Sequence, residues 1–188
     1  SDGELFYWTE SDAFEKVEGA TETAIKSLTV LNNTIWVLDG NNLYTVETGK
    51  LVKKYQLGQY GMPNAIHTLK GKLYLSSDDG FYVFEDDKES FRALLSDPIC
   101  ASAVDKEEIF LLAQNQLISY NGTVLNPIRT TDICDGFTDF YDIKKTEEGI
   151  WLASGDGLLK VPSKSGMPIQ RFTESNGLLS VSYTHLTL

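Results

Sequence analysis

Carboxylates and aromatic side chains that could recognise a polar ligand lie in the turns and links of this sequence. Asp79 and Asp156 each precede a glycine in a short turn, and Tyr60 and Phe137 lie in connecting segments. An aromatic face suits the apolar side of a sugar ring, and carboxylates accept hydrogen bonds from hydroxyl groups. These four residues are therefore candidate ligand-binding residues. The alternative is structural, because Asp before Gly stabilises a turn without any ligand.

Other kinds of chemistry find little support in the sequence. His67 lies among strand-type residues, and no Ser, His and Asp arrangement can be argued around it. The Asp-rich turns lack the alternating ligands and the closing Glu of an EF-hand loop. We therefore predict no catalytic residue, no metal site and no cofactor, and we do not expect this segment to be an enzyme.

The candidate residues belong to a unit that recurs along the chain. In each copy an apolar anchor follows a turn of Asp, Gly, Asn or Gln residues. These anchors are Leu43, Phe81, Leu117 and Leu158. Successive anchors are 38, 36 and 41 residues apart, which is the repeat length of a propeller blade.

An aromatic residue lies upstream of the turn in each copy. These aromatics are Trp36, Tyr74, Phe110 and Trp151. They could stack on sugars, but their place inside a bulky apolar run favours a structural role. We expect them to fill the space between adjacent blades.

Each unit contains short apolar runs of period two, separated by Gly and Asn turns, which predicts an antiparallel four-stranded blade. The predicted blades are 24–57, 64–95, 99–130 and 138–173. Residues 1–18 match the outer half of a blade, because Leu5 lies 38 residues before Leu43, and 176–180 match the start of another. The predicted fold class is all-β: a β-propeller fragment of about four and a half blades, an open arc of a larger ring of the seven-bladed type.

Composition limits the partners. The formal net charge is −11, and acidic residues are scattered along the chain, a pattern that repels phosphate backbones and argues against nucleic acid. No apolar run approaches the length of a membrane span, so we expect no membrane contact by this segment. Residues 181–188 look like one reading frame of a sequencing adapter, and we treat them as a non-native tail.

Two motifs resemble a known family. Residues 148–158, Glu-Gly-Ile-Trp-Leu-Ala-Ser-Gly-Asp-Gly-Leu, are similar to the signature of the two-component regulator propeller repeat. The link Tyr60-Gly61-Met62-Pro63 is similar to the Gly-Leu-Pro link of that family. The resemblance covers almost the whole chain up to residue 180, and its best match is the fourth predicted blade.

The resemblance implies a sensor. Proteins with these repeats are typically periplasmic sensor regions of hybrid two-component histidine kinases, and their ligands are usually oligosaccharides. It implies that this chain is part of a periplasmic propeller whose parent protein is anchored in the inner membrane, forms a homodimer and carries its kinase elsewhere. The remaining blades of the same propeller would be its neighbours.

Two other functions remain open at this stage. A secreted, extracellular β-propeller that acts only as a protein-interaction scaffold would have the same blades, because fold does not fix function. A propeller polysaccharide lyase or glycosidase would need catalytic carboxylates or histidines, and no recognisable pair of them stands out.

Overall fold

The computed structural model describes residues 4–8, 12–114, 116–129, 133, 136–163 and 166–178. The tail predicted at 181–188 lies outside these ranges. Regular structure within them consists of β-strands and two short 3₁₀ helices, η1 (Gly58–Tyr60) and η2 (Glu174–Asn176). No helix in this part of the chain is long and apolar enough to cross a bilayer. The predicted all-β class is confirmed.

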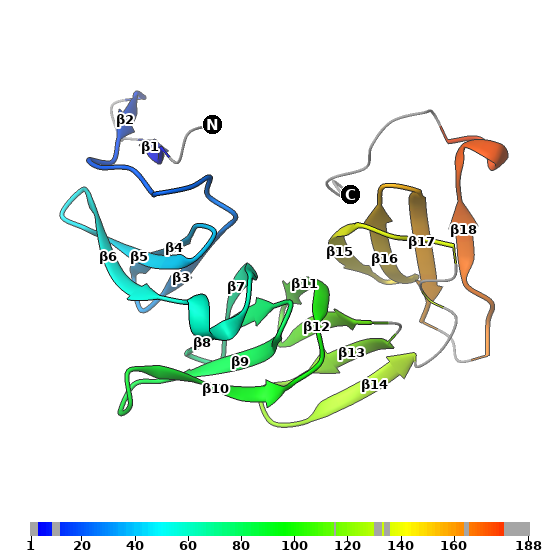
Figure 1. Ribbon diagram of the computed structural model, residues 1–188. Helices are drawn as coiled ribbons and strands as arrows, with labels where there is room; N and C mark the ends of the chain where they lie inside the picture. Colours follow the sequence, from blue (N-terminus) through cyan, green and yellow to red (C-terminus); the bar gives the residue numbers. More distant parts are fainter. Residues whose placement is uncertain are drawn as a thin grey trace. The chain divides into compact units, whose positions relative to one another are not determined.

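Four antiparallel sheets of four strands follow one another along the chain, and the strands of each sheet pair in chain order (Figure 1). We call them blades 1 to 4. Blade 1 contains β3 (Ser27–Leu31), β4 (Thr34–Leu38), β5 (Asn42–Glu47) and β6 (Lys50–Gln56). Blade 2 contains β7 (Pro63–Leu69), β8 (Lys72–Ser77), β9 (Gly80–Glu85) and β10 (Ser90–Leu95). Blade 3 contains β11 (Ile99–Asp105), β12 (Glu108–Ala113), β13 (Gln116–Tyr120) and β14 (Leu125–Arg129). Blade 4 contains β15 (Phe140–Thr146), β16 (Gly149–Ser154), β17 (Gly157–Pro162) and β18 (Gln170–Phe172).

A smaller sheet precedes blade 1. Strands β1 (Phe6–Trp8) and β2 (Phe14–Lys16) form a two-stranded antiparallel hairpin. The chain divides between Asp97 and Pro98 into two compact units. Unit 1 holds the β1–β2 hairpin with blades 1 and 2, and unit 2 holds blades 3 and 4. The fold is thus a fragment of a β-propeller, while the open arc stays a prediction.

Residues that repeat in the sequence occupy equivalent positions in the four blades. Each apolar anchor is the second residue of the third strand of its blade. Each upstream aromatic is the third residue of the second strand. Local turn chemistry sets this spacing: Asn32 and Asn33, with φ of 50° and 62°, join β3 to β4, and such positive values are typical of the tight turns that suit twisted hairpins.

The apolar core of each unit lies between its two blades. In unit 1, Leu38 and Leu43 of blade 1 pack with Ile66 and Leu75 of blade 2, and Trp36 lies against this cluster. This confirms the interblade role that was predicted for Trp36.

Unit 2 repeats the arrangement. Phe110 and Leu117 of blade 3 pack with Phe140, Ile143 and Leu152 of blade 4. Phe110 therefore also fills interblade space, as predicted. Each blade buries one apolar face against its neighbour in the same unit, and this fixes the strand ends and links that carry the candidate site.

Candidate functional site

An aspartate in the turn between the second and third strands ties that turn to the link that enters the same blade. In blade 2, Asp78 Oδ1 accepts a hydrogen bond from the backbone N–H of Met62 at 2.6 Å. In blade 4, Asp156 Oδ2 accepts from the backbone N–H of Thr138 at 2.7 Å and from its hydroxyl at 3.1 Å. We call this contact the turn–link clasp.

Blade 1 has the most buried clasp. The fully buried carboxylate of Asp39 accepts from the backbone N–H groups of Glu22 at 3.0 Å and Thr23 at 3.3 Å in the link. It also accepts from those of Asn41 at 3.0 Å and Asn42 at 2.7 Å in its own turn. Burial acts to raise the pKa of Asp39, but the hydrogen bonds from Asn42 and Asn41 outweigh it and lower that pKa below its ordinary value.

The two candidate residues of unit 1 differ in their exposure to solvent. The ring of Tyr60 is buried against Tyr82 and Phe91, and its hydroxyl accepts from the backbone N–H of Phe91 at 3.0 Å. Asp79 is exposed and lies against the link, because a Cβ added to Gly61 would stand 2.9 Å from the Cβ of Asp79. The ring of Tyr60 thus has a structural role in the core.

The two candidates of unit 2 are also brought together by a clasp. Phe137 is buried in the apolar core of the unit. Asp156 is exposed and hydrogen-bonds the next residue of the link, Thr138. The turn role of Asp156 is therefore observed directly, and its ligand-binding role stays a prediction.

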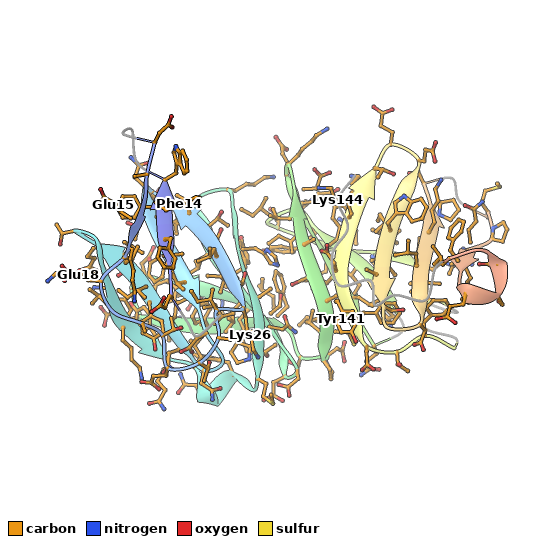
Figure 2. The ribbon with its side chains drawn as sticks, turned by 90° about the horizontal axis from the view of Figure 1, so that it is seen from above. Phe14, Glu15, Glu18, Lys26, Tyr141 and Lys144 are labelled. Atoms are coloured by element: carbon orange, nitrogen blue, oxygen red, sulfur yellow. The ribbon has the colours of Figure 1, made fainter. Side chains whose placement is uncertain are left out.

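The first strand of blades 2, 3 and 4, which we call the inner strand, has a bulge near its start. The register of the first two strands shifts by one residue there, at Asn64, Cys100 and Tyr141. Bulges of this kind often redirect a side chain next to a functional site. In blade 1 the equivalent residue is Lys26, directly before β3, and its ammonium donates to the carbonyl of Pro63 at 3.1 Å. Lys26 and Tyr141 are both labelled at the ends of their inner strands in Figure 2.

In unit 2 these bulges border a hollow of about 540 Å³. Its lining combines an exposed thiol, a phenol, a carboxylate, an amide and a hydroxyl with two aromatic rings. The lining residues are Cys100, Gln114, Phe137, Thr138, Asp139, Phe140 and Tyr141. We call it the blade 3–4 hollow. Phe137 is the member of the predicted set that lines it.

Two features make this hollow suitable for a polar ligand. Tyr141 is 47% exposed, so about half of this aromatic residue is open to solvent. Asp139 is exposed and held at a positive φ of 47°, with its carbonyl accepting from the backbone N–H of Gly155 at 3.2 Å. An aromatic face beside hydrogen-bond acceptors is the combination that hydroxyl-rich molecules require. Across the described ranges, no cluster of three His, Cys, Asp or Glu side chains could hold a metal ion.

Sequence reasoning missed Cys100, Tyr141, Asp139 and Gln114. The predicted site residues lie in turns and links, whereas three of the equivalent residues that vary most in chemistry are second in the first strand of their blades. The signal was present: Lys26, Asn64, Cys100 and Tyr141 lie at equivalent positions, and their side chains differ far more than the anchors do. Chemical variety at a fixed structural position is typical of a recognition surface.

Comparisons with known proteins bear on the fold. No protein-family model matches the sequence, and no curated protein matches it. The extracellular domain assigned to a hybrid two-component system of B. thetaiotaomicron matches with a TM-score of 0.70 and 14% identity, over 92% of this chain and 25% of that one. PorZ, a surface component of the type-IX secretion system of Porphyromonas gingivalis, matches with a TM-score of 0.58 and 14% identity, over 88% and 25% of the two chains.

A computationally designed protein, Ika8, also matches, with a TM-score of 0.54 and 13% identity, over 89% of this chain and 57% of that one. At such identities the likeness shows the fold alone. The chain spans about a quarter of the length of the natural structures named above. It has the fold of repeated four-stranded propeller blades that these proteins share.

Proposed function

We propose that this chain is part of the ligand-sensing propeller of a two-component sensor, and that the blade 3–4 hollow binds an oligosaccharide. The fold likeness to an extracellular domain assigned to a hybrid two-component system supports the first part. The second part rests on one observation: the inner-strand bulges at Cys100 and Tyr141 meet the link residues Thr138 and Asp139 around one hollow.

The chemistry of the hollow favours a neutral, hydroxyl-rich ligand. The Tyr141 ring would stack on the apolar face of a sugar, and Asp139 and Gln114 would accept hydrogen bonds from its hydroxyl groups. A negatively charged ligand is disfavoured, because the whole chain carries a formal net charge of −11.

In the parent protein such binding would act as a population shift. A ligand that binds one arrangement of a sensor dimer more tightly than another raises the population of that arrangement. The periplasmic location, the membrane anchor and the histidine kinase of the parent are parts of this proposal, and the parent gene tests them. A gene without a transmembrane helix and a kinase core would contradict it.

Calorimetric titration of the full chain with a panel of neutral and acidic oligosaccharides tests binding. We expect a neutral oligosaccharide to give saturable heat, and Tyr141→Ala to weaken its affinity by about tenfold, the value of one aromatic contact. The matched control is Tyr7→Ala, because Tyr7 is similarly exposed at 42% and lies in the other unit. Absence of binding to the whole panel, or equal losses in both variants, would contradict the proposed site.

The titrated mixtures should also be analysed for products. Unchanged oligosaccharide is expected from a binding site. Cleaved or unsaturated fragments would instead identify a glycosidase or a polysaccharide lyase.

A second candidate is an extracellular interaction scaffold. The likeness to PorZ, described as a bacterial surface component, favours it. The parent gene separates the two candidates, because a scaffold would carry a secretion or anchoring module in place of a kinase.

A further inference from the structure

An apolar groove lies in unit 1 between the β1–β2 hairpin and blade 1. Its volume is about 650 Å³, and apolar side chains dominate its lining. The lining residues are Leu5, Phe6, Tyr7, Val17, Leu28, Thr29, Val30, Ile35, Val46 and Gly49. We call it the hairpin groove.

The β1–β2 hairpin corresponds to the third and fourth strands of a blade. Leu5 lies 38 residues before the anchor Leu43. Phe6, which follows Leu5 and is the first residue of β1, pairs with Lys16 of β2, as Tyr44 pairs with Lys53 in blade 1. Every other sheet in the described part of the chain has two further strands on the inner side of its third strand. Among the described residues no strand pairs with that side of β1, and we call it the free edge of β1.

Equivalent positions in other blades show what is uncovered at this edge. Leu28, Ile66 and Ile143 each pair with the same position of the second strand. Ile66 is 1% exposed and Ile143 is 2% exposed, because the preceding blade of the same unit covers them. Leu28 is 50% exposed. Residues at this position are thus buried when a complete blade precedes them. The exposure of Leu28 therefore marks the place where two strands of the preceding blade would pack.

The contact that buries Ile66 identifies what would bury Leu28. Ile66 packs with Leu38, from the second strand of blade 1, and with Leu43, from the third. The equivalent of Leu43 in the β1–β2 hairpin is Leu5, which already lines the groove. The equivalent of Leu38 would come from a second strand paired with β1.

We propose that the free edge of β1 and the hairpin groove bind a β-hairpin, whose second strand adds antiparallel to β1 and places a bulky aliphatic side chain on Leu28. The register follows from blade 1, where Leu38 pairs with Leu43 and Val37 with Tyr44. The bound strand would thus place an aliphatic residue opposite Leu5, as Leu38 lies opposite Leu43. The residue that precedes it in the bound strand would lie opposite Phe6. Backbone hydrogen bonds to the edge give affinity, and alternate side chains give specificity.

The chemistry of the partner is therefore defined: two strands with the pattern of a blade's own first two strands. This inference concerns unit 1 and does not rest on the ligand proposed for unit 2. A synthetic copy of residues 24–40, which contains β3 and β4, is a suitable probe because it carries that pattern.

The sharpest test places the hairpin on the chain itself. A copy of residues 24–38 fused directly before Ser1 puts the copy of Leu38 five positions ahead of Leu5, the spacing that separates Leu38 from Leu43. We expect the fused full chain to melt several degrees higher than the original chain. Leu28→Asp should cancel most of this gain, since it places a charge in the contact.

A matched control is Val124→Asp, at a residue that is 51% exposed and lies in unit 2. It should leave the gain intact. The free peptide, labelled and followed by fluorescence anisotropy, should bind the full chain one to one, and Leu28→Asp should weaken it by at least about tenfold.

An unchanged melting temperature in the fused chain would overturn the proposal. So would equal losses from Leu28→Asp in the fused and original chains. Analytical ultracentrifugation of the original chain tests whether a second copy fills the groove instead. A dimer that Leu28→Asp dissociates would show that it does, and the proposed hairpin partner would then be wrong.

Discussion

Two adjacent serines of β8 are equally buried but differ in their hydrogen bonds. Ser76 and Ser77 are both fully buried. Ser77 Oγ closes the turn to β9 by accepting from the backbone N–H groups of Asp79 at 3.1 Å and Gly80 at 3.2 Å. Ser76 Oγ finds no hydrogen-bond partner among the described residues. A buried hydroxyl without a partner costs free energy, whereas one that satisfies two donors stabilises the fold.

We therefore expect opposite results from two alanine substitutions. Ser77→Ala should lower the free energy of unfolding by about 1–3 kcal/mol, because two backbone donors lose their acceptor. Ser76→Ala should leave it unchanged or raise it by up to about 1 kcal/mol. Urea unfolding of both variants measures the difference. Equal losses would show that Ser76 is satisfied by a buried water.

His67 makes stability depend on pH in a window of its own. Its side chain is buried in β7, and burial lowers its pKa from 6.5 to about 4. Above pH 6.5 the imidazole is neutral in both states and contributes no pH dependence. Below pH 6.5 the imidazole of the unfolded chain binds a proton, whereas that of the folded chain stays neutral. The free energy of unfolding therefore falls with pH down to about pH 4, where the folded state also binds the proton.

The expected loss across this window is about 3 kcal/mol, since one pKa unit corresponds to about 1.4 kcal/mol. His67→Gln keeps a polar side chain of similar size but cannot titrate, so its unfolding free energy should change much less between about pH 7 and pH 4.5. Carboxylates with lowered pKa values, such as Asp39, lose their contribution at more acidic pH and do not mask the effect. Parallel slopes for the two proteins would contradict the prediction.

At the scale of the element, the clasps explain why the turns hold their links. Asp39, Asp78 and Asp156 each receive a backbone N–H from the link that enters their blade. Blade 3 uses the main chain, with the N–H of Gln114 donating to the carbonyl of Pro98 at 3.3 Å. Burial of the carboxylate should then decide how much each clasp contributes.

The prediction compares two clasps. Asp39→Ala removes a fully buried acceptor of four backbone N–H groups and should cost about 3–5 kcal/mol. Asp156→Ala removes an exposed acceptor from the backbone and hydroxyl of Thr138 and should cost about 1 kcal/mol. Chemical denaturation of each variant measures both values. Similar costs would mean that burial does not set the strength of the clasp.

Sequence alone predicts the blades because the information is local. Period-two apolar runs and turns such as Asn32-Asn33 specify each hairpin, and the spacing of Leu43 and Phe81 repeats the unit. The candidate site depends on strand register and on contacts between distant residues, which the sequence of one segment does not specify. The bulge at Tyr141 arises from a one-residue shift between β15 and β16. The buried hydroxyl of Tyr60 accepts a hydrogen bond from the backbone N–H of Phe91, thirty-one residues away.

At the scale of the whole molecule, charge is the dominant long-range term. The formal net charge is −11, and ion pairs such as Lys53–Glu22 at 2.9 Å and Lys50–Glu18 at 2.7 Å lie mostly exposed. Exposed pairs contribute little to stability, at most about 1 kcal/mol each. Repulsion among the unpaired carboxylates acts over longer distances and opposes the compact state. Salt should therefore stabilise this chain.

We expect the melting temperature to rise by a few degrees between about 0.01 M and 0.1 M NaCl, because the screening length falls from about 30 Å to about 10 Å. Asp86 and Asp87 are exposed, and replacing both by Asn reduces the net charge from −11 to −9 by removing two negative charges. The salt-dependent rise should shrink in that variant. Lys70→Gln, at an exposed residue, changes the charge from −11 to −12 and should enlarge it. A melting temperature that falls with NaCl would mean that the surface ion pairs outweigh the repulsion, and the order of the two variants would then be reversed.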